Sequence, residues 1–557
     1  MLGLVIFFGL NLSSGLTKEA RLVHTTQGPV VGYKEPGDNV FVFHGIPYAT
    51  APTGENKYKP PLPGPKWSKP FHAVNENISC LQMKNYLITI PKEVQTENCL
   101  VANVYVPDTK ENNLPVLVII HGGAYIFGNG DFLKGKNLIR QTAMIIVNFN
   151  YRIGPHGFLC LGTPDVPGNA GMKDQVALLR WVQKNIASFG GNPDDVTISG
   201  FSSGSADVEL LTLSPITKGL FKKAILESGS GVAAFSAQTN PVKNAKDYAR
   251  LLNFDAGDDV YSLEEFYKSV PNDVLYSKDV YNATDTIFFF SPCVERDVGQ
   301  EIFLGDSPVN ILKNGEQNKL PMLFGFTEMD GLFRIPLFDE WKDRMNTKFS
   351  DFLPGDLRFK DNAEREEVAQ KVKQFYFGSQ AVSEKNIFRY IDYFTDTVFA
   401  YPTLRSVRLH VESGNENIYL YRYDFVDETA PLVPYTCVRG ADHCAQTLAV
   451  MDGVISSLAE INPSQTLNED GLSRDYKIMK AVMRYLWATF ITTGKPVLED
   501  SKPKWPPTQA NGGPYMHLDI SLKLRGPLIQ QRVLFWDDIY DKYYSYPSPP
   551  SPQSHTK

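Results

Sequence analysis

The sequence has no excess of positive charge and no long run of lysine or arginine. Its 55 Lys and Arg residues stand against 62 Asp and Glu, which gives a formal net charge of -7. Nucleic-acid-binding proteins and proteins that bind anionic membranes need a basic surface, which this composition does not offer. The 557 residues are 43% hydrophobic and 21% charged, without a clear break in composition. We therefore predict one large soluble globular unit that acts on a small molecule, with no nucleic acid as a partner.

Long apolar runs are also scarce. A membrane-spanning helix needs about 20 apolar residues, and the longest candidate, near the start of the chain, is about half that, so we predict no membrane anchor. Residues 1–15 are interpreted as a secretory signal peptide, although they lack the usual early Lys or Arg. Residues 546–557 are rich in proline and serine and predict a disordered tail. We expect a single domain over 16–545 and a secreted, extracellular protein.

Cysteine is rare, with six residues in 557. Disulfides would therefore reinforce an existing core rather than form the scaffold. Cys80 and Cys99 are the best candidate pair, and closing a loop of about 20 residues stabilises by roughly 3 kcal/mol in the chain-entropy model. Cys437 and Cys444 are close enough in sequence to pair. The remaining two are interpreted as buried thiols: Cys160 and Cys293.

Two sequons, at Asn77 and Asn282, are candidate glycan sites and agree with a secretory route. Such tripeptides also occur by chance, so each is a candidate only.

Apolar runs and helical patterns alternate through the middle of the chain, which predicts a mainly parallel α/β sheet. Residues 21–49 predict an antiparallel edge to it. Two stretches with a mostly helical and irregular pattern, 235–320 and 333–414, are interpreted as insertions that shape a pocket. The expected strands are 101–106, 116–121, 143–148, 196–199, 223–227, 322–326 and 418–425, with a short β-like end at 515–522. The expected helices are 171–188, 203–213, 362–377 and 474–493.

A Gly-x-Ser-x-Gly pentapeptide is centred on Ser202, between the expected strand 196–199 and the helical pattern 203–213. In a nucleophile elbow a strained strand-turn-helix corner holds the serine Oγ clear of the backbone, and the glycines leave room for the crowded chain. The pentapeptide alone is weak evidence, because an ordinary strand-helix turn gives the same pattern.

The partners that such a serine needs can be found separately. Gly123 and Ala124 follow a buried strand and are candidate oxyanion donors, with the amide of Ser203 as a third. The candidate acid is Asp330 at the end of a later strand, although an Asp-Gly pair is also common in surface turns. Of nine histidines, His443 lies downstream in a turn-like setting and completes the order Ser, Asp, His of an α/β hydrolase.

Several stretches together make the chain resemble a type-B carboxylesterase, the cholinesterase-like branch of the α/β-hydrolase fold that includes secreted insect carboxylesterases. The resemblance covers nearly the whole chain. The stretches that carry it are 45–49, 97–100, 150–158, 168–175 and 185–193.

The resemblance implies a large central, mostly parallel sheet flanked by helices, with helical insertions over the active-site gorge. It implies that Ser202 is the nucleophile, His443 the base and Asp330 the carboxylate, with oxyanion amides at Gly123, Ala124 and Ser203. The family's first disulfide corresponds to Cys80 and Cys99.

This chain also departs from the family pattern. The family usually has Glu where Asp330 stands, so Glu328 is the alternative acid, because a shorter side chain displaces the carboxylate. Phe201 replaces the Glu that commonly precedes the nucleophile, and the family's second internal disulfide has no obvious counterpart.

These patterns predict a serine carboxylesterase that works through an acyl-enzyme without a metal or an organic cofactor. A choline ester is less favoured, because the loop between Cys80 and Cys99 has no tryptophan for an aromatic cage. The favoured substrates are apolar esters, such as odorant or pheromone acetates, xenobiotic esters or terpenoid hormone esters. The alternative is a catalytically weak or inactive extracellular binding or adhesion module of the same family. Oligomeric state is left open, with a monomer favoured.

Overall fold

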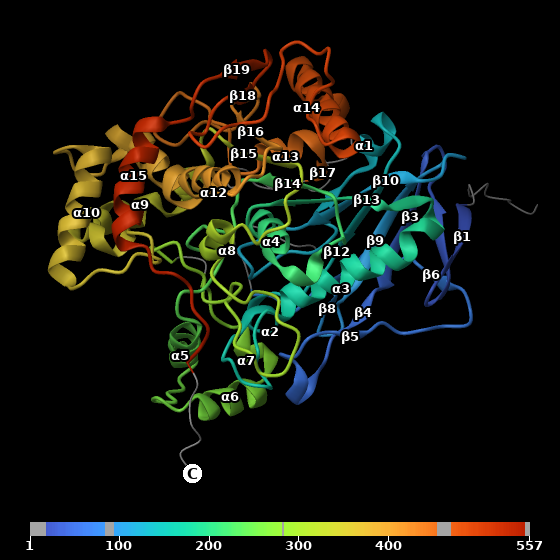
Figure 1. Ribbon diagram of the computed structural model, residues 1–557, viewed down its shortest axis with the longest axis horizontal. Helices are drawn as coiled ribbons and strands as arrows, with labels where there is room; N and C mark the ends of the chain where they lie inside the picture. Colours follow the sequence, from blue (N-terminus) through green and yellow to red (C-terminus); the bar gives the residue numbers. More distant parts are fainter. Residues whose placement is uncertain (1–17, 84–93, 281–282, 454–468, 552–557) are drawn as a thin grey trace, which may run out of the picture.

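The computed structural model describes residues 18–83, 94–280, 283–453 and 469–551. It is built around one large twisted sheet with helices on both faces (Figure 1). The predicted signal peptide, residues 1–15, lies outside the described residues, as does Asn282. Within the described residues, no helix is both long and apolar enough to span a membrane.

The sheet has 13 strands, and its central part is parallel, as predicted. From one edge to the other the strands are β1 (Glu19–Thr25), β2 (Gly28–Lys34), β3 (Val40–Pro47), β9 (Val101–Pro107), β12 (Ile145–Phe149), β10 (Leu114–Ile120), β13 (Gly191–Phe201), β14 (Lys223–Glu227), β15 (Met322–Thr327), β16 (Ile418–Tyr423), β18 (Tyr515–Leu518) and β19 (Lys523–Arg525). The run from β1 to β12 and the pair β18–β19 are antiparallel. The remaining strand, β6 (Phe71–His72), pairs with β2.

Short two-stranded ladders hold loops around this sheet. They are β4 (Ala49–Thr50) with β5 (Leu62–Pro63), β7 (Ile78–Cys80) with β8 (Val94–Thr96), and β11 (Leu133–Lys134) with β17 (Asp452–Gly453).

The alternation of side chains along the central strands divides the core into two layers. In β10, Val116 and Val118 pack into one layer, whereas Leu117 and Ile119 pack into the other. The first layer is covered by α2 (Gly154–Phe158), α3 (Ala170–Asn185), α4 (Ser203–Leu213), α8 (Pro308–Asn314) and α12 (Tyr401–Glu412). The second is covered by α1 (Lys136–Gln141), α13 (Ala445–Val450) and α14 (Arg474–Thr493). Because central strands are buried on both faces, they read as continuous apolar runs.

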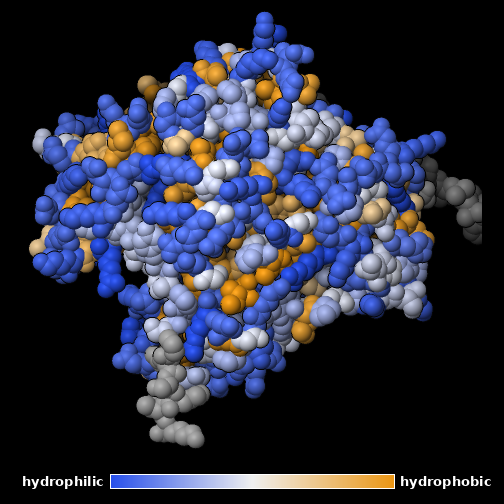
Figure 2. Space-filling view, in the orientation of Figure 1, coloured by the Kyte–Doolittle hydropathy of each residue, from blue (hydrophilic) through white to orange (hydrophobic). Residues whose placement is uncertain are grey.

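Both insertions contain helices, as predicted, and much of the first is irregular. The first contains α5 (Pro241–Leu251), α6 (Val260–Ser269) and α7 (Asn272–Leu275). The second contains the 3₁₀ segment η4 (Asp330–Leu337), α9 (Phe338–Thr347), α10 (Asn362–Phe377), α11 (Ile387–Phe394) and a π-helical turn, η7 (Thr395–Ala400), that leads into α12. The second insertion and α15 (Gln530–Tyr543) lie together at one end of the molecule (Figure 1). In the view of Figure 2, hydrophilic residues cover most of the rim.

Three expectations about the chain's covalent links and ends need correction. Cys160 and Cys293 are not buried thiols but form a disulfide, whereas Cys437 and Cys444 are both free. These expectations failed because pairing depends on spatial proximity, and Cys160 and Cys293 are 133 residues apart in sequence. The segment from Tyr546 was expected to be disordered, but its first part, up to Ser551, lies on the protein body, with Pro550 packed near Gly162.

Candidate active site

Ser202 lies at a sharp corner between β13 and α4. Its backbone has φ 56° and ψ -128°, a combination that residues other than glycine rarely adopt. The corner is crowded: a Cβ at Gly200 would lie 2.2 Å from the carbonyl oxygen of Gly204, and one at Gly204 would lie 2.4 Å from that of Ile120. The N–H of Ser202 donates to the carbonyl oxygen of Glu227 in β14, 2.9 Å away. The strained corner predicted from the pentapeptide is therefore present.

The segment after β10 runs against this corner. A Cβ at Gly122 would lie 2.9 Å from the Cβ of Ser202, and Gly123 has φ 118° with a Cβ position only 1.9 Å from the carbonyl oxygen of Phe127. Ala124 also has a positive φ, 52°. In the described part of the chain, no group accepts a hydrogen bond from the amide of Gly123 or Ala124. Two backbone donors are thus available beside Ser202.

Ser203 begins α4, so its amide belongs to the helix's first turn, whose N–H groups have no partner within the helix. The carbonyl oxygen of Ser203 accepts a hydrogen bond from the hydroxyl of Tyr125, 3.3 Å away, which fastens the segment after β10 to the start of α4. Burial lowers the pKa of His121 to about 4. Its neutral ring donates through Nδ1 to the carbonyl oxygen of Gly122, 2.8 Å away.

Asp330, the first residue of η4, and His443, in a loop, are brought together although they are 113 residues apart. Nδ1 of His443 lies 2.8 Å from Oδ1 of Asp330. Asp330 is fully buried, and its second oxygen, Oδ2, accepts hydrogen bonds from the N–H of Thr327 at 3.0 Å and from Oγ of Ser228 at 2.9 Å. Glu328, the alternative acid, is exposed. The geometry thus places Asp330, and not Glu328, on the imidazole.

The loop that carries His443 also reaches the corner at Ser202. The N–H of Met329 donates to the carbonyl oxygen of Ala441, so the loops of Asp330 and His443 are joined through their backbones. The next residue, Cys444, is fully buried and lies beside the backbone of Ser202. These contacts assemble the segments of Ser202, Asp330 and His443 into one cluster at the carboxyl ends of parallel strands, where α/β sheets usually place their sites.

Aromatic rings form an apolar wall beside His443. The ring of Phe399, in η7, is stacked on the imidazole with 4.4 Å between centroids, and that of Phe333, in η4, lies 5.6 Å from it. Phe399 also contacts Phe235, which in turn contacts Phe288. Sequence reasoning did not identify these rings, because aromatic residues are numerous and most of them are in the core.

The other sequence-predicted positions are more peripheral. Cys80 and Cys99 form a disulfide, as expected. Asn77 is exposed, as a glycan site requires.

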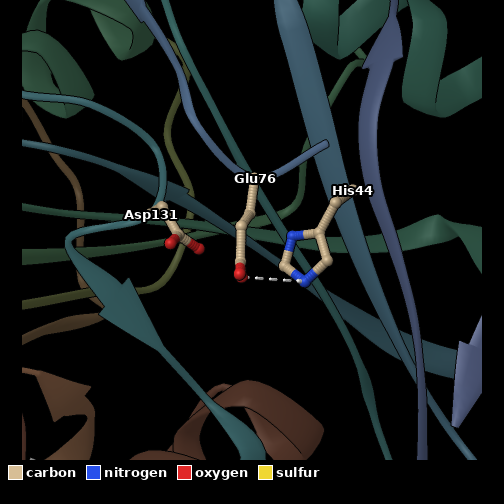
Figure 3. Close-up of side chains that lie close together, drawn as sticks. All are labelled: His44, Glu76 and Asp131. Carbon is tan, nitrogen blue, oxygen red and sulfur yellow. Dashed lines mark ion pairs between the residues drawn. The ribbon is translucent and has the colours of Figure 1, made fainter. Parts of the chain in front are cut away.

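Three side chains from separate segments, His44, Glu76 and Asp131, lie close together (Figure 3). Their possible metal-ligand atoms are all within 4.8 Å of one another. However, Nζ of Lys134 lies 3.2 Å from Asp131 and 3.6 Å from Glu76. The two carboxylates already share a cation supplied by the chain, and a metal ion would have to displace it. The sequence did not indicate this group, because its members are far apart in the chain.

Comparison with known proteins agrees with this architecture. A family model described as "Carboxylesterase family" matches residues 19–536. A venom carboxylesterase-6 of Apis mellifera is 29% identical over 93% of both chains, and a juvenile hormone esterase of Heliothis virescens is 30% identical over 88% of both. The crystal structure of juvenile hormone esterase from Manduca sexta, with OTFP covalently attached, superposes with a TM-score of 0.80 at 27% identity, covering 94% of this chain and all of that one.

Proposed function

Because this chain belongs to the carboxylesterase family and is a carboxylic ester hydrolase, we propose that it cleaves apolar esters at Ser202 through an acyl-enzyme. The observation that carries this proposal is the hydrogen bond between His443 Nδ1 and the buried carboxylate of Asp330, 2.8 Å long. A carboxylate in that position fixes the imidazole tautomer in which Nε2 can accept a proton.

In the proposed mechanism, Nε2 of His443 takes the proton from Ser202 as Oγ attacks the ester carbonyl. The amides of Gly123, Ala124 and Ser203 bind the oxyanion of the tetrahedral intermediate. His443 then protonates the leaving alcohol, which departs and leaves Ser202 acylated. Water repeats the cycle and releases the acid. The positive φ values from Gly123 to Tyr125 support this assignment, because they turn successive amides away from ordinary helix or strand pairing.

Two donors besides His443 fix the position of the Asp330 carboxylate in this proposal. The N–H of Thr327 and the hydroxyl of Ser228 both reach Oδ2. They stabilise the carboxylate and leave Oδ1 directed at the imidazole, so the shorter side chain is compensated by the position of its loop.

The proposed substrates are apolar because the rings of Phe333 and Phe399 lie beside His443. Such a wall favours uncharged acyl or alcohol groups over polar ones. A relative that is named a juvenile hormone esterase supports a terpenoid hormone ester as one candidate, and pheromone, odorant and xenobiotic esters share the same chemistry.

We also propose that the protein is secreted and monomeric. Two disulfides and two sequons are typical of an extracellular route. The signal peptide proposed at residues 1–15 would direct the chain into the secretory route.

The test is burst and steady-state hydrolysis of a short-chain aryl ester by the purified protein, combined with titration by an organophosphate. We expect a burst, one equivalent of label at Ser202, and neither in a folded Ser202→Ala variant. Glu328→Gln is the matched control, because it neutralises a carboxylate two residues from Asp330 that does not contact His443. A folded wild-type protein with neither burst nor label would replace this proposal with the binding-module alternative.

A further inference from the structure

The carboxyl group of Glu227 is buried directly behind the proposed triad. Glu227 is the last residue of β14 and is 3% exposed. Its Oε2 accepts one hydrogen bond, from Oγ1 of Thr447 at 3.2 Å, and its Oε1 has no partner among the described residues. No described Lys, Arg or His forms an ion pair with it. Burial raises the pKa of Glu227 from 4.5 to about 8.

Glu227 lies between the strand that supports the nucleophile and the helix that follows the base. Its own carbonyl oxygen accepts the N–H of Ser202 at 2.9 Å. Its side chain contacts Thr447 in α13, the helix that begins two residues after His443. One residue therefore joins both segments, through its backbone on one side and its carboxyl on the other.

A second chain of hydrogen bonds runs in parallel. Nε2 of Gln446, also in α13, donates to Oγ of Ser228, 2.8 Å away, and Ser228 donates to Oδ2 of Asp330. The end of β14 is thus hydrogen-bonded directly to Ser202 and Asp330, and through Asp330 to His443. A displacement of α13 relative to β14 would disturb both chains of contacts.

The groups that face Glu227 offer no positive charge. Tyr421 in β16 and Cys444 are fully buried, and burial raises the pKa of each well above its usual range, so both remain protonated. Two other acidic groups lie near this cluster: Asp330, which pairs with His443, and Asp442 in the adjoining loop. Trp487 of α14 faces Glu227 through its indole N–H, which is uncharged. An ionised Glu227 would therefore be a second buried anion without a counter-ion.

We propose that Glu227 is a positioning residue that works in its protonated form, and that loss of its proton to solvent at alkaline pH reversibly lowers esterase turnover. This inference rests on the proposed function of Ser202, Asp330 and His443. A neutral carboxyl holds α13 against β14 as a hydrogen-bonding but uncharged link. A buried, uncompensated carboxylate is costly, and the available relief is for α13 to move and admit water. That movement would shift Thr447 and, with it, the loop of His443.

The experiment is a profile of kcat and kcat/KM from pH 6 to pH 10 for an aryl ester, with wild type, Glu227→Gln and Thr447→Val. In the wild type we expect kcat to fall above pH 8 by roughly tenfold per pH unit, because the loss of a single proton that is required for turnover gives this slope. Glu227→Gln conserves shape and hydrogen bonding without a proton to lose, so we expect turnover at pH 7 to persist and this decline to disappear. The Thr447 hydrogen bond lowers the pKa of Glu227, so Thr447→Val should move the decline to higher pH.

A matched control is Asp207→Asn in α4. Asp207 is also fully buried, its pKa is raised by burial to about 8, and its Oδ2 accepts a hydrogen bond from Gln175 at 2.6 Å. We expect this variant to retain the alkaline decline. Loss of the decline in Asp207→Asn but not in Glu227→Gln would overturn the proposal. So would a folded Glu227→Gln protein that is inactive at every pH, because the charged form would then be the required one.

A readout that is independent of turnover separates this inference from the proposed function. The infrared difference spectrum of wild type minus Glu227→Gln should contain a protonated-carboxyl band at pH 7 that is absent at pH 10. If that band is found in a protein without a burst, the proposed function fails while the protonation state of Glu227 stands. If the band is missing at pH 7, the inference itself is wrong.

Discussion

The ring of Phe399 lies almost parallel to the imidazole of His443, with 4.4 Å between the centroids and 23° between the planes. Asp330 holds the same imidazole through Nδ1. The base of the proposed triad is therefore fixed by a hydrogen bond in the ring plane and by an aromatic face across it. The π-helical turn η7 matters here because it is the element that carries Phe399.

Replacing this ring should lower catalytic efficiency without unfolding the protein. We expect Phe399→Leu to reduce kcat/KM for aryl esters by about 2- to 10-fold, since an aromatic pair contributes about 0.5–1.5 kcal/mol beyond its buried area. Phe375→Leu is the control, because Phe375 is stacked on Phe535 at 3.9 Å in a different part of the molecule. Equal kinetics for Phe399→Leu and wild type would show that the stacked ring does not orient His443.

The carboxylate of Asp330 should be essential for turnover. We expect Asp330→Asn to lower kcat by roughly 10³- to 10⁴-fold, because the amide favours the wrong tautomer of His443. Glu328→Gln should change kcat little, since Glu328 is exposed and does not contact the imidazole. Single-turnover acylation kinetics of the two variants provide the measurement. The reverse order of effects would make Glu328 the acid.

Gly123 should not tolerate a side chain. A Cβ there would lie 1.9 Å from the carbonyl oxygen of Phe127, so Gly123→Ala must move the backbone that carries the proposed oxyanion donors. We expect a loss of about 10²- to 10³-fold in kcat, as for removal of one oxyanion donor.

Gly37→Ala is the matched control for Gly123→Ala, because Gly37 also has a positive φ, 79°, but open space around it. Any cost of the left-handed backbone alone then appears in the control. Activity of Gly123→Ala close to that of Gly37→Ala would argue against the proposed donors.

The stability of the protein should depend on pH through Glu227. Folding raises the pKa of Glu227 from its ordinary value of 4.5 to about 8. The contribution of Glu227 to stability is therefore fully present below pH 4.5 and is lost as the pH rises toward about 8. Glu227→Gln does not titrate, so its stability relative to wild type should increase across this window by up to about 1.4 kcal/mol per pH unit. Guanidinium unfolding at pH 5, 7 and 8.5 measures the difference. A constant difference at all three pH values would mean that Glu227 titrates normally.

The disulfide between Cys160 and Cys293 should contribute more stability than the one between Cys80 and Cys99. The two bridges close 133 and 19 residues of chain, which corresponds to about 5 and about 3 kcal/mol in the chain-entropy model. Double alanine variants of each pair, compared by their guanidinium midpoints, test the order. Cys437→Ala is the control, because that cysteine is free and exposed. A larger loss from the shorter bridge would contradict the chain-entropy account.

The central sheet could be predicted from the sequence because its strands are buried on both faces and read as short apolar runs. Residues 223–227 form β14 with the predicted bounds, whereas β13 extends from Gly191 to Phe201, well beyond the predicted 196–199. The first part of β13 is polar and partly exposed, so hydrophobicity did not reveal it. The predicted helix 171–188 ends at Asn185, and a 3₁₀ turn follows.

Site residues could be predicted only where a sequence pattern indicated them. Gly200 and Gly204 mark the corner at Ser202, because each packs against backbone that leaves no room for a Cβ. Ser228, Phe399 and the bridge between Cys160 and Cys293 had no local pattern, since their partners come from elements far away in sequence. Ser228 had one indirect signal: it follows a strand that neighbours the corner strand, and parallel strands end at the same edge of the sheet.

The bridge between Cys160 and Cys293 encloses Ser202 but leaves Asp330 and His443 outside. Because a chain is made from its N-terminus, the covalent ring around the proposed nucleophile can close before either of its partners has left the ribosome. A newly made chain in an oxidising compartment would thus hold its serine in a closed ring while lacking the base that activates it. Esterase activity would then begin only when the segments of Asp330 and His443 have docked beside Ser202, so the order of synthesis itself would delay the reaction until well after the ring has closed.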